Sequence, residues 1–181
     1  RQIADESTVL LKNDKDLLPL NLSQLKSMLS SDRTQTRCSL EIILGAVPTK
    51  MASPAGRHTQ AGGTGRIKIR YAKGCNMMSM DTTQIAAAVE AARQSDAAIL
   101  FCGSASASLA RDYHETNCGE GFDLTDLSLT GAQGKLIQAV HATGKPVVLV
   151  LVTGKPFAIA WEKEHIPPSL YNGMQESRKQ L

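Results

Sequence analysis

The sequence predicts an α/β fold, a three-layer α/β/α sandwich with a mainly parallel sheet. Residues 147–152 form an unbroken run of valine and leucine, which is typical of a strand buried on both faces of a parallel sheet. Residues 97–102 form a second apolar run of strand length, and segments with one apolar helical face lie near both runs. Strands that alternate with helices in this way form crossover units around a parallel sheet.

The composition agrees with this fold and with a single domain over residues 1–181. Apolar residues make up 42% of the chain and aromatic residues only 4%, which favours a helix-covered sheet over an aromatic-rich β-sandwich. A chain of 181 residues is long enough to bury a sizeable core. One compact domain is therefore expected.

The N-terminal region is predicted to begin with a helix over residues 1–12. Residues 9–11 are apolar and follow charged residues, and Pro19 ends the segment because the residue before a proline disfavours helix. Residues 21–38 are mostly polar and predict no regular element.

Two strands are predicted in the next part of the chain, over residues 40–47 and 67–71. The first is an apolar run before Pro48, and the second alternates with period two. Between them, residues rich in Gly, Pro, Ser and Thr predict a loop. The glycines at 62, 63 and 65 lack the spacing of a phosphate-binding loop, so no nucleotide site is expected.

Two helices are predicted from their start signals and apolar faces. Asp81 and Gln84 have the spacing of a capping box at the start of the first helix. Thr130 and Gln133 have the same spacing at the start of the second, which Gly144 is placed to end.

The C-terminal region is predicted to contain a short helix and a short strand. The helix is expected over residues 157–163, and the strand over residues 169–171 after Pro167 and Pro168. The polar residues that follow are expected to fray.

A long loop over residues 103–129 is the predicted functional site. It leaves the carboxyl end of the strand at 97–102, the edge at which open α/β sheets place ligand sites. Long loops without secondary structure inside compact domains are usually functional, and the alternative is a surface excursion without function. Its charged and titratable residues are Arg111, Asp112, His114, Glu115, Glu120, Asp123 and Asp126.

Several protein classes are disfavoured by the charge and hydropathy patterns. The basic residues are scattered despite a net charge of +3, so no nucleic-acid partner is indicated. No stretch reaches the length of about 18 apolar residues that a membrane span needs. Residues 1–6 lack the apolar core of a signal peptide.

No metal or cofactor is expected. The cysteines form no C-x-x-C pair, and His114 with Cys118 is too small a set of ligands for a zinc site. The serines after Gly103 do not match the G-x-S-x-G pattern of a serine hydrolase.

Several stretches are similar in order and spacing to a known family. They are residues 4–13 with Leu17–Leu20, Tyr71–Cys75, Glu120–Asp123 with Leu127–Leu129 and Gln133, and Val150–Pro156 with Trp161. Over residues 1–170 the chain resembles the C-terminal α/β domain of family 3 glycoside hydrolases, the β-glucosidase and β-xylosidase group.

The chain departs from this family at several positions. Leu124 and Thr130 stand where the family commonly has Arg and Pro, and residues 45–49 and 173–177 differ from the family's motifs at the corresponding places. The sequence also stops before the family's final strand. These departures leave the predicted fold unchanged.

The resemblance implies a two-domain enzyme of which this chain is one part. An N-terminal (β/α)8 barrel is expected to supply a nucleophilic aspartate, and this domain the acid/base carboxylate and sugar contacts. The chain is therefore expected to be a fragment that lacks the barrel and its own final strand, and to be inactive alone. The expected reaction is retaining hydrolysis of terminal β-linked glucose or xylose from a glycoside or oligosaccharide, by a periplasmic or extracellular enzyme. The alternative is a non-catalytic α/β module that binds a small polar ligand or a protein partner.

Within the long loop, Glu120 is the candidate acid/base residue. Its flanking glycines let the backbone take a tight path and direct the side chain into a pocket, and the resemblance places the family's acidic position here. Glu115 is the rival candidate because loop lengths vary in this region. Arg111 and Asp112 are candidate substrate-binding residues, and an internal ion pair between them is the alternative.

Two further residues, one in the loop and one in the predicted helix over residues 157–163, are expected to be structural. Asp123 is expected to accept hydrogen bonds from nearby backbone N–H groups and to fix the end of the loop. Trp161 is expected to pack against the core rather than to line a sugar site.

Overall fold

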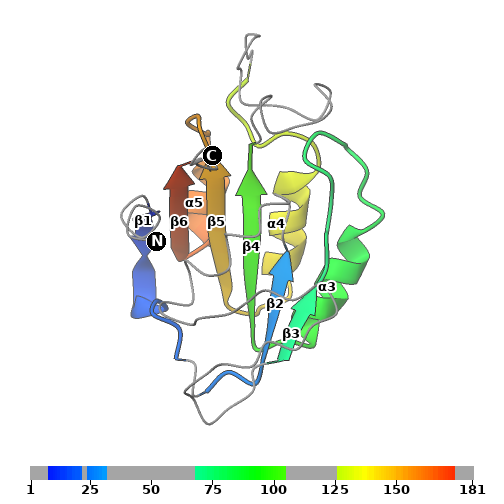
Figure 1. The fold of residues 1–181 in the computed structure, drawn as a ribbon, viewed down its shortest axis with the longest axis vertical. Helices are drawn as coiled ribbons and strands as arrows, with labels where there is room; N and C mark the ends of the chain where they lie inside the picture. The colour runs from blue at the N-terminus through cyan, green and yellow to red at the C-terminus, as the bar shows by residue number, and fades with distance from the viewer. Residues whose placement is uncertain (1–7, 22–23, 32–67, 105–125, 174–181) are drawn as a thin grey trace, which may run out of the picture.

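A computed structural model describes residues 8–21, 24–31, 68–104 and 126–173 (Figure 1). The strand predicted over 40–47 and the loop predicted over 48–66 lie outside these ranges. Within them, no helix is long and apolar enough to cross a bilayer. In chain order the elements are β1 (Thr8–Asn13), the 3-10 helix η1 (Asp14–Asp16), β2 (Ser27–Ser31), β3 (Lys68–Tyr71), α3 (Ile85–Arg93), β4 (Ala97–Gly103), α4 (Gln133–His141), β5 (Val147–Thr153), α5 (Ala160–His165) and β6 (Pro168–Gly173).

The described strands form one sheet in the order β1-β6-β5-β4-β2-β3. Neighbouring strands are parallel except for β1, which runs antiparallel to β6. β5 lies between β4 and β6, and its first five residues, 147–151, are at most 3% exposed. The predicted α/β class, the mainly parallel sheet and the inner position of residues 147–152 are therefore confirmed.

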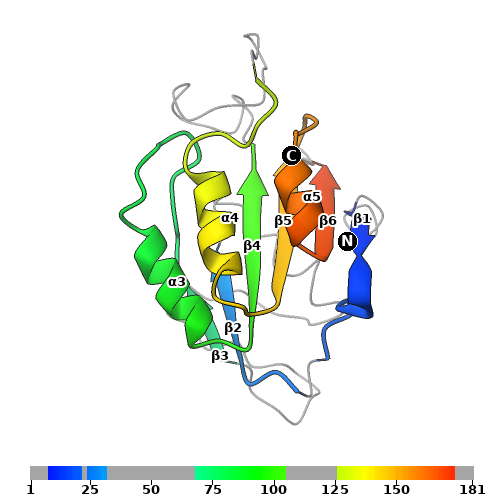
Figure 2. The ribbon, with the colours of Figure 1, turned by 180° about the vertical axis from the view of Figure 1, so that it is seen from behind.

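The two faces of the sheet are covered by different parts of the chain. α3, α4 and α5 all pack on one face, which Figure 2 shows from the helix side. The side chains of the same strands that point to the opposite face form a second buried cluster, of Met28, Ile99, Phe101, Val148 and Val150. Residues 17–20 pack against this second cluster through three leucines. Within the described ranges, the helices thus supply one outer layer and residues 17–20 cover part of the other face.

The N-terminal segment contains a strand, and the helix predicted over residues 1–12 is wrong where the structure describes it. β1 pairs antiparallel with β6, with an irregularity between Leu10 and Lys12. Residues 9–11 are each about half exposed, so no single buried face decides their conformation. Backbone pairing with a strand far away in the sequence decides it instead.

β2 was not predicted, because the polar residues 21–38 gave no sign of a strand. Its five residues include only two apolar ones, Met28 and Leu29, which are 1% and 0% exposed. β2 lies between β4 and β3 and bonds to both. β2 thus contributes one apolar residue to the buried cluster on each face of the sheet, Leu29 on the helix side and Met28 on the other.

The helices lie close to their predicted positions, but neither α3 nor α4 begins with the predicted capping box. Asp81 instead accepts hydrogen bonds from the backbone N–H and the hydroxyl of Thr83, each at 2.9 Å. Gly144 follows α4 with a φ of +73°, as its predicted role at the helix end requires. Gln133, the last residue of the second predicted box, accepts a hydrogen bond from Gly103 at the end of β4 instead.

Candidate functional site

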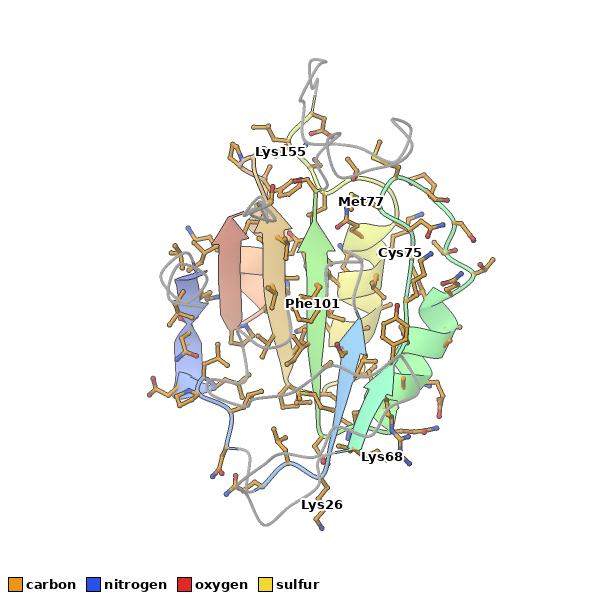
Figure 3. The ribbon with its side chains drawn as sticks, viewed as in Figure 1. Lys26, Lys68, Cys75, Met77, Phe101 and Lys155 are labelled. Atoms are coloured by element: carbon orange, nitrogen blue, oxygen red, sulfur yellow. The ribbon has the colours of Figure 1, made fainter. Side chains whose placement is uncertain are left out.

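The carboxyl ends of β4 and β5 meet at one edge of the sheet, and the predicted functional loop leaves from this edge. β4 ends at Gly103, and the chain is described again from Asp126 onward. Figure 3 shows Lys155 and Met77 at this edge, whereas Lys26 and Lys68 lie at the opposite one. The predicted site residues Arg111, Asp112, Glu115 and Glu120 lie outside the described residues, as do His114, Cys118 and Asp123.

Gln133 holds the end of β4 through both atoms of its side-chain amide. It is fully buried, and its Oε1 accepts a 2.8 Å hydrogen bond from the N–H of Gly103. Its Nε2 donates to the carbonyl of Gly103 at 3.1 Å and to the hydroxyl of Thr130 at 3.1 Å. The Thr130 hydroxyl in turn donates to the carbonyl of Met77 at 3.0 Å. The amide thus joins β4, the start of α4 and the segment after β3.

Gly103 is required at this point because of a close backbone contact. Its φ is +142°, and an added Cβ would lie 1.9 Å from the carbonyl oxygen of Val152. That conformation is strained for any residue with a side chain. The chain therefore leaves β4 in a direction that only glycine permits.

The next residue, Ser104, is bound to the end of β5. Its N–H donates to the carbonyl of Val152 at 2.9 Å, and its hydroxyl lies 2.8 Å from that of Thr153. The Thr153 hydroxyl donates to the carbonyl of Lys155 at 2.9 Å and accepts from the N–H of Lys155 at 3.0 Å. Since Thr153 has only one hydroxyl proton, Ser104 is the donor of the pair. Ser104 is fully buried and engaged, so it is structural and not a nucleophile.

The chain returns at Asp126, whose carboxylate organises a tight turn. Its Oδ1 accepts hydrogen bonds from the N–H and the hydroxyl of Ser128, each at 2.9 Å. The bond from the Ser128 N–H has the largest effect in lowering the pKa of Asp126, and the bond from the Ser128 hydroxyl also lowers it. The charge of Lys155 lowers this pKa further. The carbonyl of Leu127 accepts a 2.9 Å bond from the N–H of Ala158. Asp126 thus fixes this turn through its carboxylate.

Gly131 anchors the following residues against the segment after β3. Its φ is +60°, and an added Cβ would lie 2.7 Å from the carbonyl oxygens of both Met77 and Ser79. The N–H of Ala132 also donates to the carbonyl of Ser79 at 2.9 Å. Described residues at the carboxyl edge of the sheet therefore hold the chain on both sides of segment 105–125.

Gln133, Thr153 and Lys155 are the residues whose role sequence reasoning missed. Gln133 has the spacing of a capping residue, and nothing local shows that its partner lies 30 residues earlier in the chain. Thr153 and Lys155 lie in the family-like stretch Val150–Pro156, which by itself assigns no contact to either residue. The position of both directly after the strongest predicted strand is the one signal that points to this edge.

Trp161 lies in the helical layer, in agreement with the packing interpretation. It packs against the helix-side core. Its ring stacks on His165 with centroids 4.3 Å apart, and His141 meets it edge-on at 5.6 Å. Among the described residues, no group of three or more His, Cys, Asp or Glu side chains could hold a metal ion.

A family model and several relatives match this chain along most of its length. The model described as the glycosyl hydrolase family 3 C-terminal domain matches residues 8–179. A beta-xylosidase of Formosa agariphila is 36% identical over 96% of this chain and 24% of its own length. Thermostable beta-glucosidase B of Acetivibrio thermocellus is 32% identical over 89% of this chain and 20% of its own length.

Solved structures give the same picture. The GH3 beta-glucosidase of Bifidobacterium adolescentis is 30% identical, with a TM-score of 0.64 over 93% of this chain and 23% of its own. A GH3 exo-beta-xylosidase is 26% identical, with a TM-score of 0.66 over 95% of this chain and 21% of its own. The chain thus spans between a fifth and a quarter of the length of these relatives.

Proposed function

Because the chain belongs to the family of glycosyl hydrolase family 3 C-terminal domains, we propose that it is the proton-donating domain of a larger retaining β-glycosidase. The substrate is a glycoside or oligosaccharide that ends in β-linked glucose or xylose. The relatives named beta-xylosidase and beta-glucosidase support this substrate class. A partner (β/α)8 barrel in the same protein supplies the nucleophilic aspartate.

The observation that carries the proposal is the way in which the carboxyl edge of the sheet is built. Buried side chains hold Gly103 and Ser104 on one side of segment 105–125. On the other side, the carbonyl of Leu127 accepts a hydrogen bond from the N–H of Ala158. Gly131 lies close to the carbonyls of Met77 and Ser79. A carboxylate carried by this segment therefore belongs to a stretch of backbone that is held on both sides. General acid catalysis requires a proton donor that is held in position.

Retaining cleavage needs two carboxyl groups about 5–5.5 Å apart, one on each side of the scissile bond. In this proposal, the barrel's aspartate attacks the anomeric carbon while Glu120 gives its proton to the departing oxygen. Glu120 then removes a proton from the water that releases the sugar. Glu115 is the rival for this role, and Arg111 and Asp112 contact sugar hydroxyls.

The 181-residue chain alone is expected to be inactive. It supplies one of the two carboxyl groups, and the loss of positioning by the barrel is worth about 7–11 kcal/mol of barrier. The measurement is hydrolysis of a nitrophenyl β-glucoside and a nitrophenyl β-xyloside by the purified chain. Turnover that disappears in the Glu115→Gln or Glu120→Gln variant of the isolated chain would contradict this expectation.

The decisive experiment assigns the proton donor in the full-length protein. Glu120→Gln is expected to reduce hydrolysis of substrates with poor leaving groups by about 10²–10⁴-fold. Glycosylation by activated aryl glycosides should suffer much less, because a phenolate departs without a proton. Azide should restore turnover, since an anionic nucleophile needs no general base.

Glu115→Gln is the matched control, because it removes the same charge from the same loop. It should show neither the leaving-group dependence nor the azide rescue. If the two variants exchange these behaviours, Glu115 is the acid/base residue. If neither variant shows them, the proposed catalytic role fails, and a non-catalytic binding module becomes the better description.

A further inference from the structure

Two methionines on the segment after β3 are exposed at the carboxyl edge of the sheet. Met80 is 64% exposed, the largest value for a big apolar side chain among the described residues, and Met78 is 42% exposed. Figure 3 shows the neighbouring Met77 at this edge. Single exposed apolar residues are normal on a protein surface, but neighbouring ones at a functional edge are candidates for an interaction surface. We call Met78 and Met80 the methionine rim.

The backbone that carries the methionine rim is held against the start of α4. The carbonyl of Met77 accepts a 3.0 Å hydrogen bond from the hydroxyl of Thr130. The carbonyl of Ser79 accepts a 2.9 Å bond from the N–H of Ala132. The two chain segments touch at Gly131, where an added Cβ would lie 2.7 Å from both of these carbonyl oxygens. This part of the chain is therefore fixed to the helix layer.

Met80 lies between two residues that are themselves anchored. The N–H of Asp81 donates to the hydroxyl oxygen of Ser79 at 3.1 Å, and the carboxylate of Asp81 accepts from the N–H and the hydroxyl of Thr83, each at 2.9 Å. A surface whose backbone is already ordered loses less conformational entropy on binding. The flexible methionine side chain adapts to irregular apolar partners. The methionine rim thus combines a fixed backbone with adaptable apolar side chains, which suits a docking surface.

The methionine rim is also linked to the end of β4 through one buried side chain. The Nε2 atom of Gln133 lies 3.4 Å from the carbonyl oxygen of Met77 and donates to the carbonyl of Gly103 at 3.1 Å. Gln133 is fully buried. A partner that contacts the rim therefore contacts a segment that is hydrogen-bonded to the point where the chain leaves the sheet.

The partner domain of the proposed glycosidase is the occupant that this surface fits. The chain spans 24% and 20% of the lengths of two relatives, so most of a protein of that length lies outside it. Retaining hydrolysis needs two carboxyl groups about 5–5.5 Å apart, which brings the barrel to the carboxyl edge. A second copy of the chain at this edge would exclude the barrel. Sugar hydroxyls are poorly matched to thioether and methylene groups, because polar groups buried without hydrogen bonds cost free energy.

We propose that the methionine rim is a docking surface that packs against an apolar surface of the (β/α)8 barrel in the same protein. This inference rests on the proposed function, because that function supplies the barrel. The packed methionines exclude water and fix the position of the two domains relative to each other. The hydrogen bonds of Thr130 and Gln133 connect this contact with the end of β4.

The first test measures methionine oxidation by hydrogen peroxide in the full-length enzyme, followed by mass spectrometry of its peptides. Met78 and Met80 should oxidise at least about tenfold more slowly in the native enzyme than in urea, because oxidation follows exposure. Met28 is the internal reference for a buried methionine, since it is only 1% exposed. Oxidation of Met80 in the native enzyme at a rate close to that in urea would overturn the proposal.

The second test identifies the occupant. Photo-methionine, a diazirine analogue of nearly the same shape, replaces methionine throughout the full-length enzyme. Irradiation should join the peptide that contains Met78 and Met80 to a peptide of the barrel. Crosslinks from this peptide only to residues of the same domain, or to a second copy of the protein, would contradict the proposal even if both methionines resist oxidation.

The third test changes the polarity of the rim without changing its size. In the full-length enzyme, the double variant Met78→Gln/Met80→Gln should lower kcat/KM by about tenfold or more for poor and activated leaving groups alike, since a 1 Å misplacement can cost about 100-fold. Met78→Leu/Met80→Leu keeps the apolar surface and should retain most of the activity. Circular dichroism should show an unchanged fold for both, because both side chains are exposed.

Leu10→Gln is the matched control, because Leu10 is 51% exposed in β1, at the other end of the sheet from β3. Its kcat/KM should stay within about twofold of the unchanged enzyme, as is usual for surface substitutions. Full activity of the double glutamine variant would overturn the proposal. A loss that depends on the apolarity of the aglycone would assign the rim to substrate binding instead, and would also overturn it.

The Glu120→Gln and Glu115→Gln variants separate this inference from the proposed function. If either shows the leaving-group dependence and azide rescue while Met80 oxidises freely, the docking surface is wrong and the glycosidase assignment stands. If neither variant shows them, the proposed catalytic role fails. Crosslinks to the barrel would still establish the docking surface in that case, because they do not depend on the reaction.

Discussion

The two edges of the parallel sheet are fixed by different chemistry. At the carboxyl edge, the buried amide of Gln133 and the buried hydroxyls of Ser104 and Thr153 hold the strand ends. At the amino edge, the exposed carboxylate of Asp96 accepts bonds from the N–H groups of Lys26 and Ser27 at 2.8 and 2.7 Å. Water can replace the bonds at the amino edge but not those at the carboxyl edge. The buried bonds at the carboxyl ends of β4 and β5 are therefore sensitive to substitution, and the bonds of Asp96 at the amino edge are sensitive to pH.

The largest effect is expected from Gly103→Ala. The added Cβ would lie 1.9 Å from the carbonyl oxygen of Val152, at a φ of +142°. The free energy of unfolding should fall by about 4 kcal/mol or more, which can abolish folding. Gly134→Ala is the control, because nothing lies within 4 Å of its added Cβ, and helix propensity should stabilise the chain by about 0.5 kcal/mol. Urea unfolding of the 181-residue chain measures both, and similar values for the two would remove the special role of Gly103.

The next largest effect is expected from Gln133→Met. The N–H and carbonyl of Gly103 would lose this buried partner, and the free energy of unfolding should fall by about 2–4 kcal/mol. Gln138→Met changes an exposed glutamine of the same helix and should stay within about 0.5 kcal/mol. The deficit of Gln133→Met should be the same at pH 7 and pH 5, because an amide does not titrate. A pH-dependent deficit would erase the distinction between the two edges.

A smaller effect is expected from Thr153→Val. Valine has a similar shape but removes the hydroxyl shared by Ser104 and Lys155, so the free energy of unfolding should fall by about 1–2 kcal/mol. Thr153→Ser keeps the hydroxyl and should retain the hydrogen bonds. Thermal unfolding followed by circular dichroism compares the two. If Thr153→Val is no less stable than Thr153→Ser, the shared hydroxyl does not contribute the expected stability.

The smallest effect is expected at the amino edge, from Asp96→Asn. Hydrogen bonds from the backbone N–H of Lys26 and then of Ser27 lower the pKa of Asp96 below its ordinary value of 3.8. Because its pKa is lowered in the folded state, the carboxylate stabilises the fold at pH values above its pKa in the unfolded state. This contribution is lost as the pH falls through the pKa of the folded state. Stability should therefore decline below about pH 5, and Asp96→Asn should decline less steeply. Parallel curves for the two proteins, measured by urea unfolding at several pH values, would show that Asp96 is not responsible.

The sequence predicted best the parts of the fold in which the local pattern and the tertiary structure agree. Residues 97–102 and 147–152 are apolar because both faces of β4 and β5 are buried, and α3 and α4 have one apolar face each. β2 and β1 were missed or misassigned because their conformation depends on backbone pairing with distant strands. No local pattern in Ser27–Ser31 or Thr8–Asn13 records that pairing.

The candidate site shows the same division. The location at the carboxyl edge of β4 followed from the order of strands and helices. The supporting residues did not, because Gln133 bonds to Gly103 and Thr153 bonds to Ser104 across 30 and 49 positions. A side chain that serves a distant backbone group looks in the sequence like an ordinary polar residue.

The antiparallel pairing of β1 with β6 has a consequence for folding during synthesis on the ribosome. Thr8 of β1 pairs with Asn172 of β6. The first described strand to be synthesised can therefore pair only after the last one has been synthesised. At about 5–20 residues per second, this delay is roughly ten to thirty seconds. Throughout that time Val9, Leu10 and Leu11, which remain about half exposed even in the finished fold, lack β6, the neighbour of β1 among the described strands. The nascent chain therefore offers chaperones an apolar strand until its partner has been translated.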